Sequence, residues 1–413
     1  MNTNQSSQLS DLSVLCITKA EPSILPLLNN LSHLRRFGAE LVIVSDGKPA
    51  YNKLFEYLPC DSLIQVESAG YIESVHDSCL QYTTRRYILR LDDDESISAP
   101  MLDWLLAGKY RNQLHWKFSR IHLWADDQTT IINPPLFPDH QTRLSVRQLA
   151  GGRGIIHCGS PHGGGELAPV AILHHKFLVK SIHERQHIRQ QYNQIMPNAG
   201  ESFLPFSVPE DYYSGIYDLK PLPLVQAFAG VLHRMEQINA EIWPFAEWLY
   251  NRRPHNVLEI GVRHGGTSAL WHGFCTGRIV GVDWEGRDGL GEETRKVHAA
   301  LTLQYPRFES IIGDSHSGET IRRIDDKSDD GYDFIFIDGD HTYEGVREDF
   351  INFKCVLSRG GCIAFHDIVD TPTTRNAGQG VFKFWNKLKV WHPGKWKEFS
   401  INGEWGGLGV YTP

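Results

Sequence analysis

The sequence predicts an α/β protein built from two domains, and three observations lead to this expectation. The chain has 413 residues, which is too long for one ordinary hydrophobic core. Short apolar runs alternate with amphipathic stretches in both halves, as parallel strands separated by helices do. The proline- and glycine-rich stretch EDYYSGIYDLKPLPL, residues 210–224, interrupts this alternation. We therefore expect a disordered tail at residues 1–11, one domain at 12–215, a linker at 216–223 and a second domain at 224–413.

The composition narrows the class of protein. A hydrophobic fraction of 41% and a charged fraction of 22% are typical of a chain that folds around sizeable cores. The net charge is -8, and no concentrated basic face is visible in the sequence. Because neutralising nucleic-acid phosphates needs such a face, we expect no nucleic-acid partner. Small anionic ligands remain compatible with this charge.

The cysteines and the first residues bear on location. Seven cysteines are scattered along the chain without a CxxC pair, which favours reduced thiols in a cytoplasmic protein. The start MNTNQSSQLS has neither the basic residues nor the apolar run of a secretory signal. No apolar stretch is long enough to span a membrane. We expect a cytoplasmic protein, which leaves room for peripheral membrane contact and for a homo-oligomer.

The first half shows four apolar runs with the length of buried strands. These runs are LSVLCIT at 12–18, ELVIVSDG at 40–47, SLIQVES at 62–68 and RRYILRLDDD at 85–94, with an amphipathic helix expected at 24–37. From about residue 114 to 187 the chain is rich in aromatic residues, glycine and proline. Such a region typically forms the wall and lid of a site, and an irregular surface excursion is the alternative.

The second half repeats the alternation with polar strand ends. A helix is expected at 224–250, and it is followed by the runs NVLEIGV, RIVGVDW, FESIIGD, YDFIFIDGD and GGCIAFHD. Each run ends at or next to a polar or acidic residue. In an open α/β sheet the binding crevice lies at the carboxyl ends of the strands, so these side chains are candidates for a site.

A glycine-rich turn follows the first of these runs. Gly261, Gly265 and Gly266 lie between the strand NVLEI and a helix, where glycine allows a ligand to approach the backbone and the helix offers N–H donors. The spacing is GxxxGG and differs from the dinucleotide pattern GxGxxG. A tight turn without a ligand is the alternative. Asp283, at the next strand end, suits a ribose diol, and the strand after it ends near Asp314.

Residues 224–413 resemble a class I S-adenosylmethionine (SAM) methyltransferase. The resemblance is carried by VLEIGVRHGGTS, IVGVD, DFIFIDGDHTYEGVREDF and GGCIAFHD in this order, and it is closest to a subgroup with sugar O-methyltransferases and proteins labelled cephalosporin hydroxylases. It implies SAM as cofactor, held by six residues: Glu259, Gly261 and Gly265 at the methionine part, Asp283 at the ribose, and Asp314 with Ser315 at the adenine.

The segments IDGDHTY and FHD suggest chemistry beyond cofactor binding. Asp338, His366 and Asp367 supply oxygen and nitrogen ligands for Mg²⁺ or Mn²⁺, although relatives often have an acidic residue in place of His366. A cation there would lower the pKa of a sugar hydroxyl. His341 is the candidate base, because DxxH has these two roles in the sugar O-methyltransferases that the chain resembles. A helix-capping or surface histidine is the alternative for His341.

Three consecutive carboxylates end a strand in the first half. Asp92, Asp93 and Asp94 follow YILRL, and clustered acids need water or a cation to stay ionised. A divalent metal that bridges a diphosphate would provide this charge. A solvated turn is the alternative, since acidic runs are usually exposed.

Residues 12–213 resemble, more loosely, a family 2 glycosyltransferase of the GT-A fold. The resemblance rests on the opening strand, VSDG, LDDDE and FPDHQTRLSVR. It implies a nucleotide sugar held by Thr18, Glu21, Asp46, Asp92 and Asp93, with Asp94 as ligand of a divalent metal, Mg²⁺ or Mn²⁺.

Other residues of this half are candidates for binding the diphosphate or the acceptor. His174 and His175 are further candidates for the metal or the diphosphate, and core or surface histidines are the alternative. Where relatives show histidine followed by an acid, this chain has His157 and Cys158, so Asp139 is the substitute base for the acceptor hydroxyl. Gln141 and Arg143 match a QxRL element near the acceptor.

The preferred interpretation is a bifunctional enzyme of glycan assembly. One domain would transfer a sugar from a nucleotide-sugar donor, and the other would methylate a sugar hydroxyl on a glycan or on a glycosylated small molecule. The main alternative is a methyltransferase with a non-catalytic N-terminal domain that binds a sugar nucleotide or a glycan. A scaffold without catalysis and an NAD-dependent oxidoreductase are further alternatives, and the missing GxGxxG pattern weighs against the oxidoreductase.

Overall fold

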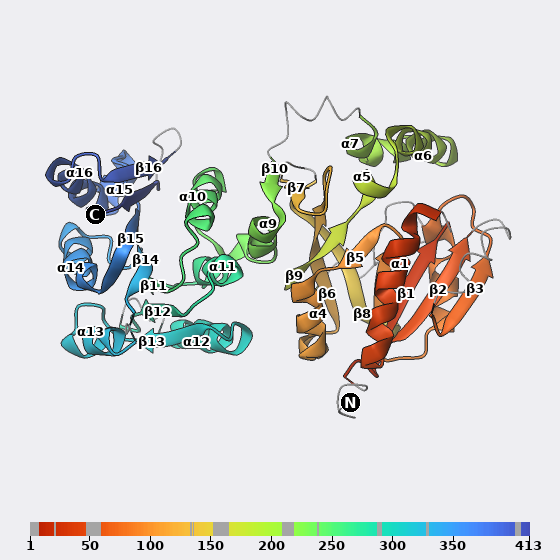
Figure 1. The fold of residues 1–413 in the computed structure, drawn as a ribbon, viewed down its shortest axis with the longest axis horizontal. Coiled ribbons are helices and arrows are strands. Elements are labelled where there is room, and N and C mark those ends of the chain that lie inside the picture. Colours follow the sequence, from red (N-terminus) through yellow and green to blue (C-terminus); the bar gives the residue numbers. More distant parts are fainter. Residues whose placement is uncertain are drawn as a thin grey trace. The chain divides into compact units, whose positions relative to one another are not determined.

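The computed structural model describes residues 8–19, 22–46, 59–132, 134, 136–151, 165–208, 219–237, 239–286, 291–327, 330–400 and 406–413. The chain divides into two compact units, Met1–Gly230 and Val231–Pro413, named here unit 1 and unit 2. Each unit has its own sheet, so the mixed α/β architecture expected from the sequence is confirmed (Figure 1). None of the helices in the described ranges combines the length and the apolar character needed to cross a lipid bilayer.

Unit 1 is organised around an eight-stranded sheet with the order β3-β2-β1-β4-β8-β6-β9-β5 (Figure 1). Strands β1 to β4 are parallel to one another, and β8 runs antiparallel to both β4 and β6. All seven positions of LSVLCIT and of ELVIVSD are buried, as expected for parallel strands covered on both faces. The strands are β1 (Leu12–Thr18), β2 (Glu40–Asp46), β3 (Ser62–Val66), β4 (Tyr87–Asp92), β5 (Glu95–Ile97), β6 (His115–His122), β7 (Thr129–Ile131), β8 (Asp139–Val146), β9 (Glu166–His174) and β10 (Leu219–Pro221).

The helices of unit 1 complete its core. Leu28 of α1 and Trp104 of α4 pack in one apolar cluster with Val14 and Leu41, whereas the alternate strand residues Leu15 and Val42 belong to another cluster. The helices are α1 (Leu25–Leu31), α3 (His76–Cys79), α4 (Ala99–Leu106), α5 (Lys176–Val179), α6 (Ile182–Ile195), α7 (Leu204–Ser207) and α9 (Leu222–Phe228). The helix expected at 24–37 is shorter than predicted, because its second half forms a 3-10 helix at Ser32–Phe37.

The residues just before β1 belong to the fold of unit 1. Leu9 is fully buried in the apolar core, and its N–H donates to the carbonyl of Phe37 over 2.8 Å. Asp11 forms an ion pair with Arg111 at 2.8 Å. Residues 8–11 are therefore not part of a tail, unlike the expectation for 1–11, and residues 1–7 lie outside the described residues.

The boundary between the units lies later in the chain than predicted. β10 pairs with β7, and the N–H of Leu222 donates to the carbonyl of Gln128, so residues 219–230 fold with unit 1. Gly230 has a φ of +80°, where a non-glycine residue is strained. This bend interrupts the single helix expected at 224–250, which the structure replaces with α9, a 3-10 turn at Leu232–Arg234 and α10.

Unit 2 has a seven-stranded sheet with the order β13-β12-β11-β14-β15-β17-β16 (Figure 1). The strands from β13 to β15 are parallel, and β17 runs antiparallel to both β15 and β16. Its elements are α10 (Asn239–Arg252), β11 (Val257–Ile260), α11 (Gly266–Phe274), β12 (Ile279–Asp283), α12 (Gly291–Gln304), β13 (Phe308–Ile312), α13 (Gly318–Asp325), β14 (Tyr332–Ile337), α14 (Tyr343–Phe353), β15 (Leu357–His366), α15 (Pro372–Asn376), α16 (Val381–Trp391), β16 (Trp396–Phe399) and β17 (Leu408–Tyr411).

Strand β14 shows how the two faces of this sheet are covered. Phe334 and Phe336 form edge-on ring contacts with Trp271 of α11, and Phe334 also forms a tilted contact with Phe245 of α10. The alternate residue Ile335 lies in the apolar cluster with Trp385 of α16. The period of two in YDFIFI therefore sends aromatic residues to one helical layer and isoleucines to the other.

The strand order reverses at β11, because the chain goes from β11 to β12 on one side and β14 lies on the other. A crevice at the carboxyl ends of the strands is expected at such a reversal. Gly261 directly follows β11 there and lies beside Asp338, which directly follows β14. A Cβ atom built on Gly261 would lie 2.2 Å from the carbonyl oxygen of Asp338. The glycine is thus required for the close approach of the two strand ends.

We expect Gly261→Ala to destabilise unit 2 more than backbone strain alone would. Gly261 has a φ of +91°, and a left-handed alanine costs about 1 kcal/mol before the clash with Asp338 is counted. The matched control is Gly360→Ala, because Gly360 has a φ of +83° but open space around the added Cβ. Hydrogen exchange of peptides from β11 and β14 would measure both changes, and equal losses of protection would contradict the clash.

Candidate functional site

Glu259 lies inside the structure beneath the glycine-rich turn. Its side chain is fully buried in β11, and both carboxylate oxygens accept hydrogen bonds from α11, one from the hydroxyl of Thr267 and one from that of Ser268. Burial raises the pKa of Glu259 to about 8, although these two hydroxyl groups act in the opposite direction. Glu259 thus links α11 to β11 and stabilises the turn between them, which is predicted to hold the methionine part of SAM.

This raised pKa predicts a pH-dependent stability. The folded chain keeps the Glu259 proton up to about pH 8, whereas the unfolded chain releases it near the ordinary value of 4.5. Between these values the unfolded state binds fewer protons, so the free energy of unfolding falls by about 1.4 kcal/mol for each pH unit. Glu259→Gln should remove this part of the slope in hydrogen exchange of β11 peptides between pH 5 and pH 8.

A matched control is Glu309→Gln, which changes a half-exposed carboxylate paired with Arg278 at 2.8 Å. It should keep the wild-type slope. If Glu259→Gln also kept that slope, the buried carboxyl group would not hold its proton in the folded chain.

Asp283 lies at the end of β12 and contacts the same turn. Its Oδ2 accepts from the N–H groups of Val262 and Arg263 at 3.1 and 2.7 Å, and its Oδ1 accepts from the N–H of Trp284 at 2.7 Å. The side chain is half-buried. Asp283 therefore adjoins the glycine-rich turn, as a ribose-binding residue would, and its predicted role stays a prediction.

Asp314 and Ser315 follow β13 but differ in exposure. The side chain of Asp314 is 45% exposed, and its Oδ1 accepts from the N–H of His316 at 2.9 Å. The hydroxyl of Ser315 donates to Oδ1 of Asp349, a fully buried residue of α14, at 2.7 Å. The hydrogen bond to Asp349 raises the pKa of His316 to about 9. Ser315 thus has a structural partner that the sequence did not indicate.

The strand ends of β14 and β15 bring together the four residues predicted for metal binding and catalysis. Nδ1 of His341 lies 2.8 Å from Oδ2 of Asp367, and its Nε2 lies 3.5 Å from Oδ1 of Asp338. Nδ1 of His366 lies 3.3 Å from Oδ1 of Asp338 and 3.5 Å from Oδ1 of Asp367. The two histidines therefore lie between the same two carboxylates. We call His341, Asp338, His366 and Asp367 the His–Asp cluster.

The carboxylates control the protonation of this cluster. Burial alone would lower the pKa of His341, but hydrogen bonds to Asp338 and Asp367 raise it to about 10. The pKa of His366 is also raised, because the charge of Asp338 outweighs its burial. Burial would raise the pKa of Asp338, and the two imidazoles lower it well below its usual range. Without another cation, Asp338, His341 and His366 favour their charged forms.

Two glutamines that contact the cluster come from distant segments. Nε2 of Gln237 donates to Oδ2 of Asp338 at 2.9 Å, and Nε2 of Gln379 donates to Oδ2 of Asp367 at 3.1 Å. The N–H of Gly380 donates to the carbonyl of His341 at 2.7 Å. Gln379 lies between α15 and α16. Gln237 was missed, because no pattern connects it with a strand end 101 residues away.

The oxygen and nitrogen donors of the cluster are of the kinds that bind a divalent cation. Their distances in the structure are those of histidine–carboxylate pairs. Among the described residues, no three His, Cys, Asp or Glu side chains have the arrangement of a metal site. However, Oδ1 of Asp367 is buried and makes no hydrogen bond within the described part of the chain. Imidazoles and carboxylates become ligands once the shared protons leave. Asp338, Asp367 and His366 therefore fit a cation in chemistry.

Unit 1 contains a cavity of about 570 Å³ at the carboxyl ends of β1 and β4. Asp92 lines it beside Arg143, whose guanidinium group also donates to Glu95 at 2.7 Å. Burial would raise the pKa of Asp92, but the charges of Arg143 and Arg90 lower it to about 2. Asp92 is thus an ionised group paired with arginine. Glu95, fully buried, was missed although it is the fourth acid of LDDDE.

The neighbouring acids are also engaged by side chains. Asp93 accepts a hydrogen bond from the hydroxyl of Thr18 at 3.0 Å. Two of the residues predicted to bind the nucleotide sugar are therefore in contact. Oδ1 of Asp94 lies 3.3 Å from Nε2 of His174, and its Oδ2 lies 3.4 Å from Nζ of Lys176. Both oxygens of Asp94 face cationic or imidazole groups, so the residues do not fit the divalent metal that was predicted there.

Three more predicted residues of unit 1 have structural partners. Asp46 accepts from the N–H of Ser68 at 2.8 Å, and His175 lies 2.7 Å from the hydroxyl of Ser96. Asp139 accepts from Arg120 at 2.7 Å, lies 3.0 Å from His122 and accepts from Gln141 at 2.6 Å. Burial would raise the pKa of Asp139, but these partners lower it well below its usual range, which weakens it as a base. Glu21, His157 and Cys158 lie outside the described residues.

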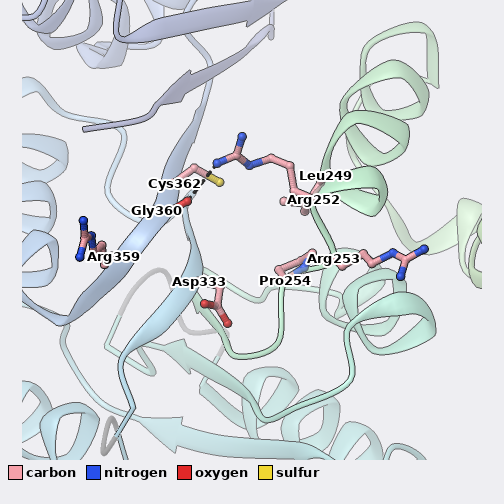
Figure 2. Close-up of a pocket in the computed structure, with 8 residues that line it drawn as sticks. All are labelled: Leu249, Arg252, Arg253, Pro254, Asp333, Arg359, Gly360 and Cys362. Atoms are coloured by element: carbon pink, nitrogen blue, oxygen red, sulfur yellow. Dashed lines mark hydrogen bonds between the residues drawn. The ribbon is translucent and has the colours of Figure 1, made fainter.

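A second hollow, of about 300 Å³, lies in unit 2 at the opposite ends of the strands (Figure 2). Figure 2 shows the guanidinium groups of Arg253 and Arg359 pointing to opposite sides, while Arg252 donates to the carbonyl of Gly360 at 3.0 Å. The arginines do not converge on a common point. This hollow therefore lacks the converging side chains that the strand ends beside Gly261 carry.

Comparisons with known proteins agree with the fold of unit 2. Residues 258–368 match a family described as "Methyltransferase domain". This match and the strand order confirm a methyltransferase domain of Rossmann-like fold in the C-terminal region. The match ends at residue 368, directly after the last residue of the His–Asp cluster. The GT-A fold of unit 1 stays a prediction.

Two curated relatives and one solved structure illustrate the similarity. The chain is 29% identical to the uncharacterized protein y4gI of Sinorhizobium fredii over 160 residues, which is 36% of this chain. It is 31% identical to the uncharacterized protein R132 of Acanthamoeba polyphaga mimivirus over 114 residues, which is 27% of this chain. These matches span only 17% and 51% of the relatives. The O-methyltransferase TomG from Streptomyces achromogenes, solved with SAM, is 19% identical, with 49% of this chain and 95% of that chain covered and a TM-score of 0.35.

Proposed function

We propose that unit 2 transfers a methyl group from SAM to a hydroxyl group of a sugar. The observation that carries this proposal is the position of His341 between the carboxylates of Asp338 and Asp367. These groups lie at the strand ends beside Gly261, where the sheet order reverses and a cofactor is expected. An acid–base group next to a sulfonium donor is what methylation of a hydroxyl requires.

The cofactor would lie along the glycine-rich turn. Glu259 holds α11 against β11, which keeps Gly261 and Gly265 in place near the methionine part. Asp283 adjoins the turn and would accept hydrogen bonds from the ribose diol. Asp314 lies further along the same sheet edge, where its half-exposed carboxylate would meet the adenine. Ser315 would contribute there only through its link to Asp349.

In its neutral form, His341 would remove the proton of the acceptor hydroxyl as the oxygen attacks the methyl carbon of the sulfonium. Asp367 orients its ring through Nδ1, and Gln379 donates to the same carboxylate, which leaves Nε2 on the side of Asp338. The hydroxyl oxygen gains the methyl group, and the sulfur keeps the electron pair of the broken bond. Positioning of the two reactants supplies the remainder of the rate enhancement.

Asp338, Asp367 and His366 would hold a divalent cation, Mg²⁺ or Mn²⁺, in this proposal. When bound, the cation would supply positive charge that lowers the pKa of the acceptor hydroxyl. The buried Oδ1 of Asp367 and the oxygen-rich donor set support this assignment.

Removal of divalent ions with EDTA should therefore stop methyl transfer, and added Mg²⁺ or Mn²⁺ should restore it.

The proposal is tested by incubating the full chain with labelled SAM, Mg²⁺ and a panel of nucleotide sugars, glycans and glycosylated small molecules. Mass spectrometry should detect a methylated sugar. Calorimetry with SAM alone separates two failures. SAM binding without any methylated product would support the cofactor site and contradict a sugar as the acceptor. Absence of SAM binding would contradict the methyltransferase proposal itself.

For unit 1 we propose glycosyl transfer from a nucleotide-sugar donor, with a GT-A fold. Support comes from the cavity of about 570 Å³ at the strand ends, which has the size of a cofactor pocket. Asp92 and Asp93 lie at its wall with Thr18 bound to Asp93. The fusion would raise the local concentration of an intermediate shared by the two units.

A non-catalytic unit 1 that only binds a sugar nucleotide or glycan is the competing proposal. The pairing of Asp139 with Arg120 and His122 favours it, because a carboxylate held by these partners is a weaker base. Release of nucleoside diphosphate from a panel of nucleotide sugars would decide. Turnover that Asp92→Asn abolishes would support catalysis, and binding without turnover would support the competing proposal.

A further inference from the structure

The partners of Asp94 differ in kind from those of the His–Asp cluster in unit 2. Asp94 is 3% exposed, and one of its oxygens lies 3.4 Å from the ammonium group of Lys176. Burial would raise the pKa of Asp94, but the charges of Lys176 and His174 hold it well below its usual range. A charged ammonium has no lone pair and cannot bind a metal. Lys176 therefore lies where a cation bound to Asp94 would lie.

The position of Lys176 also brings its charge to the cavity. It is the first residue of α5, two positions after the end of β9, and its side chain is 17% exposed at the cavity wall. Its Nζ lies 5.2 Å from the centre of the Phe206 ring, a cation–π distance. Lys180, four residues later, lines the same cavity and is buried. Two ammonium groups thus border the space next to the acidic strand end.

We infer that unit 1 binds the diphosphate of a nucleoside diphosphate through Lys176, without a divalent cation at Asp94. The inference rests on the proposed sugar-nucleotide function of unit 1. A diphosphate next to Asp92, Asp93 and Asp94 needs a positive charge to offset their repulsion, and lysine is a common phosphate-binding point charge. An ammonium group has three N–H donors, so its contact with Asp94 is compatible with a phosphate oxygen as a further acceptor.

In this arrangement Asp94 is a positioning residue. Its carboxylate limits the directions open to the flexible Lys176 side chain, and Nε2 of His174 lies 3.3 Å from the other carboxylate oxygen. Nδ1 of His174 lies 2.7 Å from Nδ1 of His122, which in turn contacts Asp139. The acid thus belongs to a buried chain of side chains that holds the lysine at the cavity wall.

The test is calorimetric titration of UDP and GDP into the full chain, once with EDTA and once with Mg²⁺ or Mn²⁺. We expect affinities that agree within about twofold between the two conditions for the nucleotide that binds, because no cation takes part. Lys176→Met should weaken binding by about tenfold or more, and Lys176→Arg, which keeps the charge, should retain most of it. Lys117→Met, on β6 and outside the cavity lining, is the matched control and should bind as the wild type does.

Mn²⁺ binding followed by electron paramagnetic resonance gives an independent readout. Asp94→Asn should leave the number of bound Mn²⁺ ions per chain unchanged, whatever unit 2 binds. Nucleotide binding that requires Mg²⁺ or Mn²⁺, or a Mn²⁺ site lost in Asp94→Asn, would overturn the inference and leave the donor function of unit 1 intact. Absence of binding of both nucleotides under all conditions would remove the donor function together with this inference. The EDTA comparison uses the wild-type chain, so it remains decisive even if Lys176→Met fails to fold.

Discussion

Asp367→Asn is expected to lower the rate of methyl transfer by about 100-fold or more while SAM still binds with its wild-type affinity. The change removes the charge of a carboxylate that is 3% exposed and lies 2.8 Å from His341 and 3.5 Å from His366. Loss of one group that acts on the reacting proton has an effect of this size. Single-turnover rates with labelled SAM and calorimetry of SAM would measure the two quantities.

Asparagine is chosen because it keeps the shape of the side chain and tolerates the left-handed backbone of Asp367, which has a φ of +61°. The matched control is Asp370→Asn, three residues later, where the carboxylate forms an exposed ion pair with Arg375 at 2.6 Å. It should leave methyl transfer within about twofold, since exposed ion pairs contribute little. A full rate in Asp367→Asn would remove the His–Asp cluster from the mechanism.

His341→Ala is expected to lower kcat by about 10²- to 10⁴-fold, the range for loss of a general base, with little change in SAM affinity. The reason is the position of the ring between Asp338 and Asp367, at the strand ends beside the cofactor turn. Measured kcat and KM separate this outcome from a binding defect. Imidazole added to the buffer should restore part of the rate, because the deletion leaves a space of that shape.

The matched control for His341 is His255→Ala. His255 contacts the hydroxyl of Thr276 at 2.8 Å near the opposite end of β11, away from the proposed site. Its replacement should leave kcat unchanged. If His341→Ala raised only the Kd for SAM and kept kcat, His341 would be a structural residue, which is the helix-capping alternative named for the sequence.

Local patterns predicted the strands and what lies at their ends. The run YDFIFID gave a buried strand with Asp338 at its end because apolar periodicity and strand termination are encoded within a few residues. The same argument placed Asp283 and Asp367 at one edge of the sheet, and the structure confirms that edge. The predicted roles of these residues toward SAM and a metal stay predictions.

Features that depend on distant partners could not be predicted in this way. Nothing near residue 94 indicates that Lys176, 82 positions later, supplies its counter-charge, because β9 and α5 reach it only through the sheet order. The apolar run at 224–250 predicts one helix, whereas the structure has α9, a 3-10 turn and α10 there. The pairing of β10 with β7 moves that boundary, and strand pairing between remote segments has no local signature.

At position 367, thermal stability and the proposed reaction favour different residues, because Asp367 has a left-handed backbone. A residue with a side chain costs about 1 kcal/mol more than glycine in this conformation. Glycine at 367 would relieve that strain but remove the carboxylate on which the proposed reaction depends. Heat-resistant variants sought by replacing strained residues with glycine should therefore keep Asp367, and a screen for melting temperature alone would select against the enzyme.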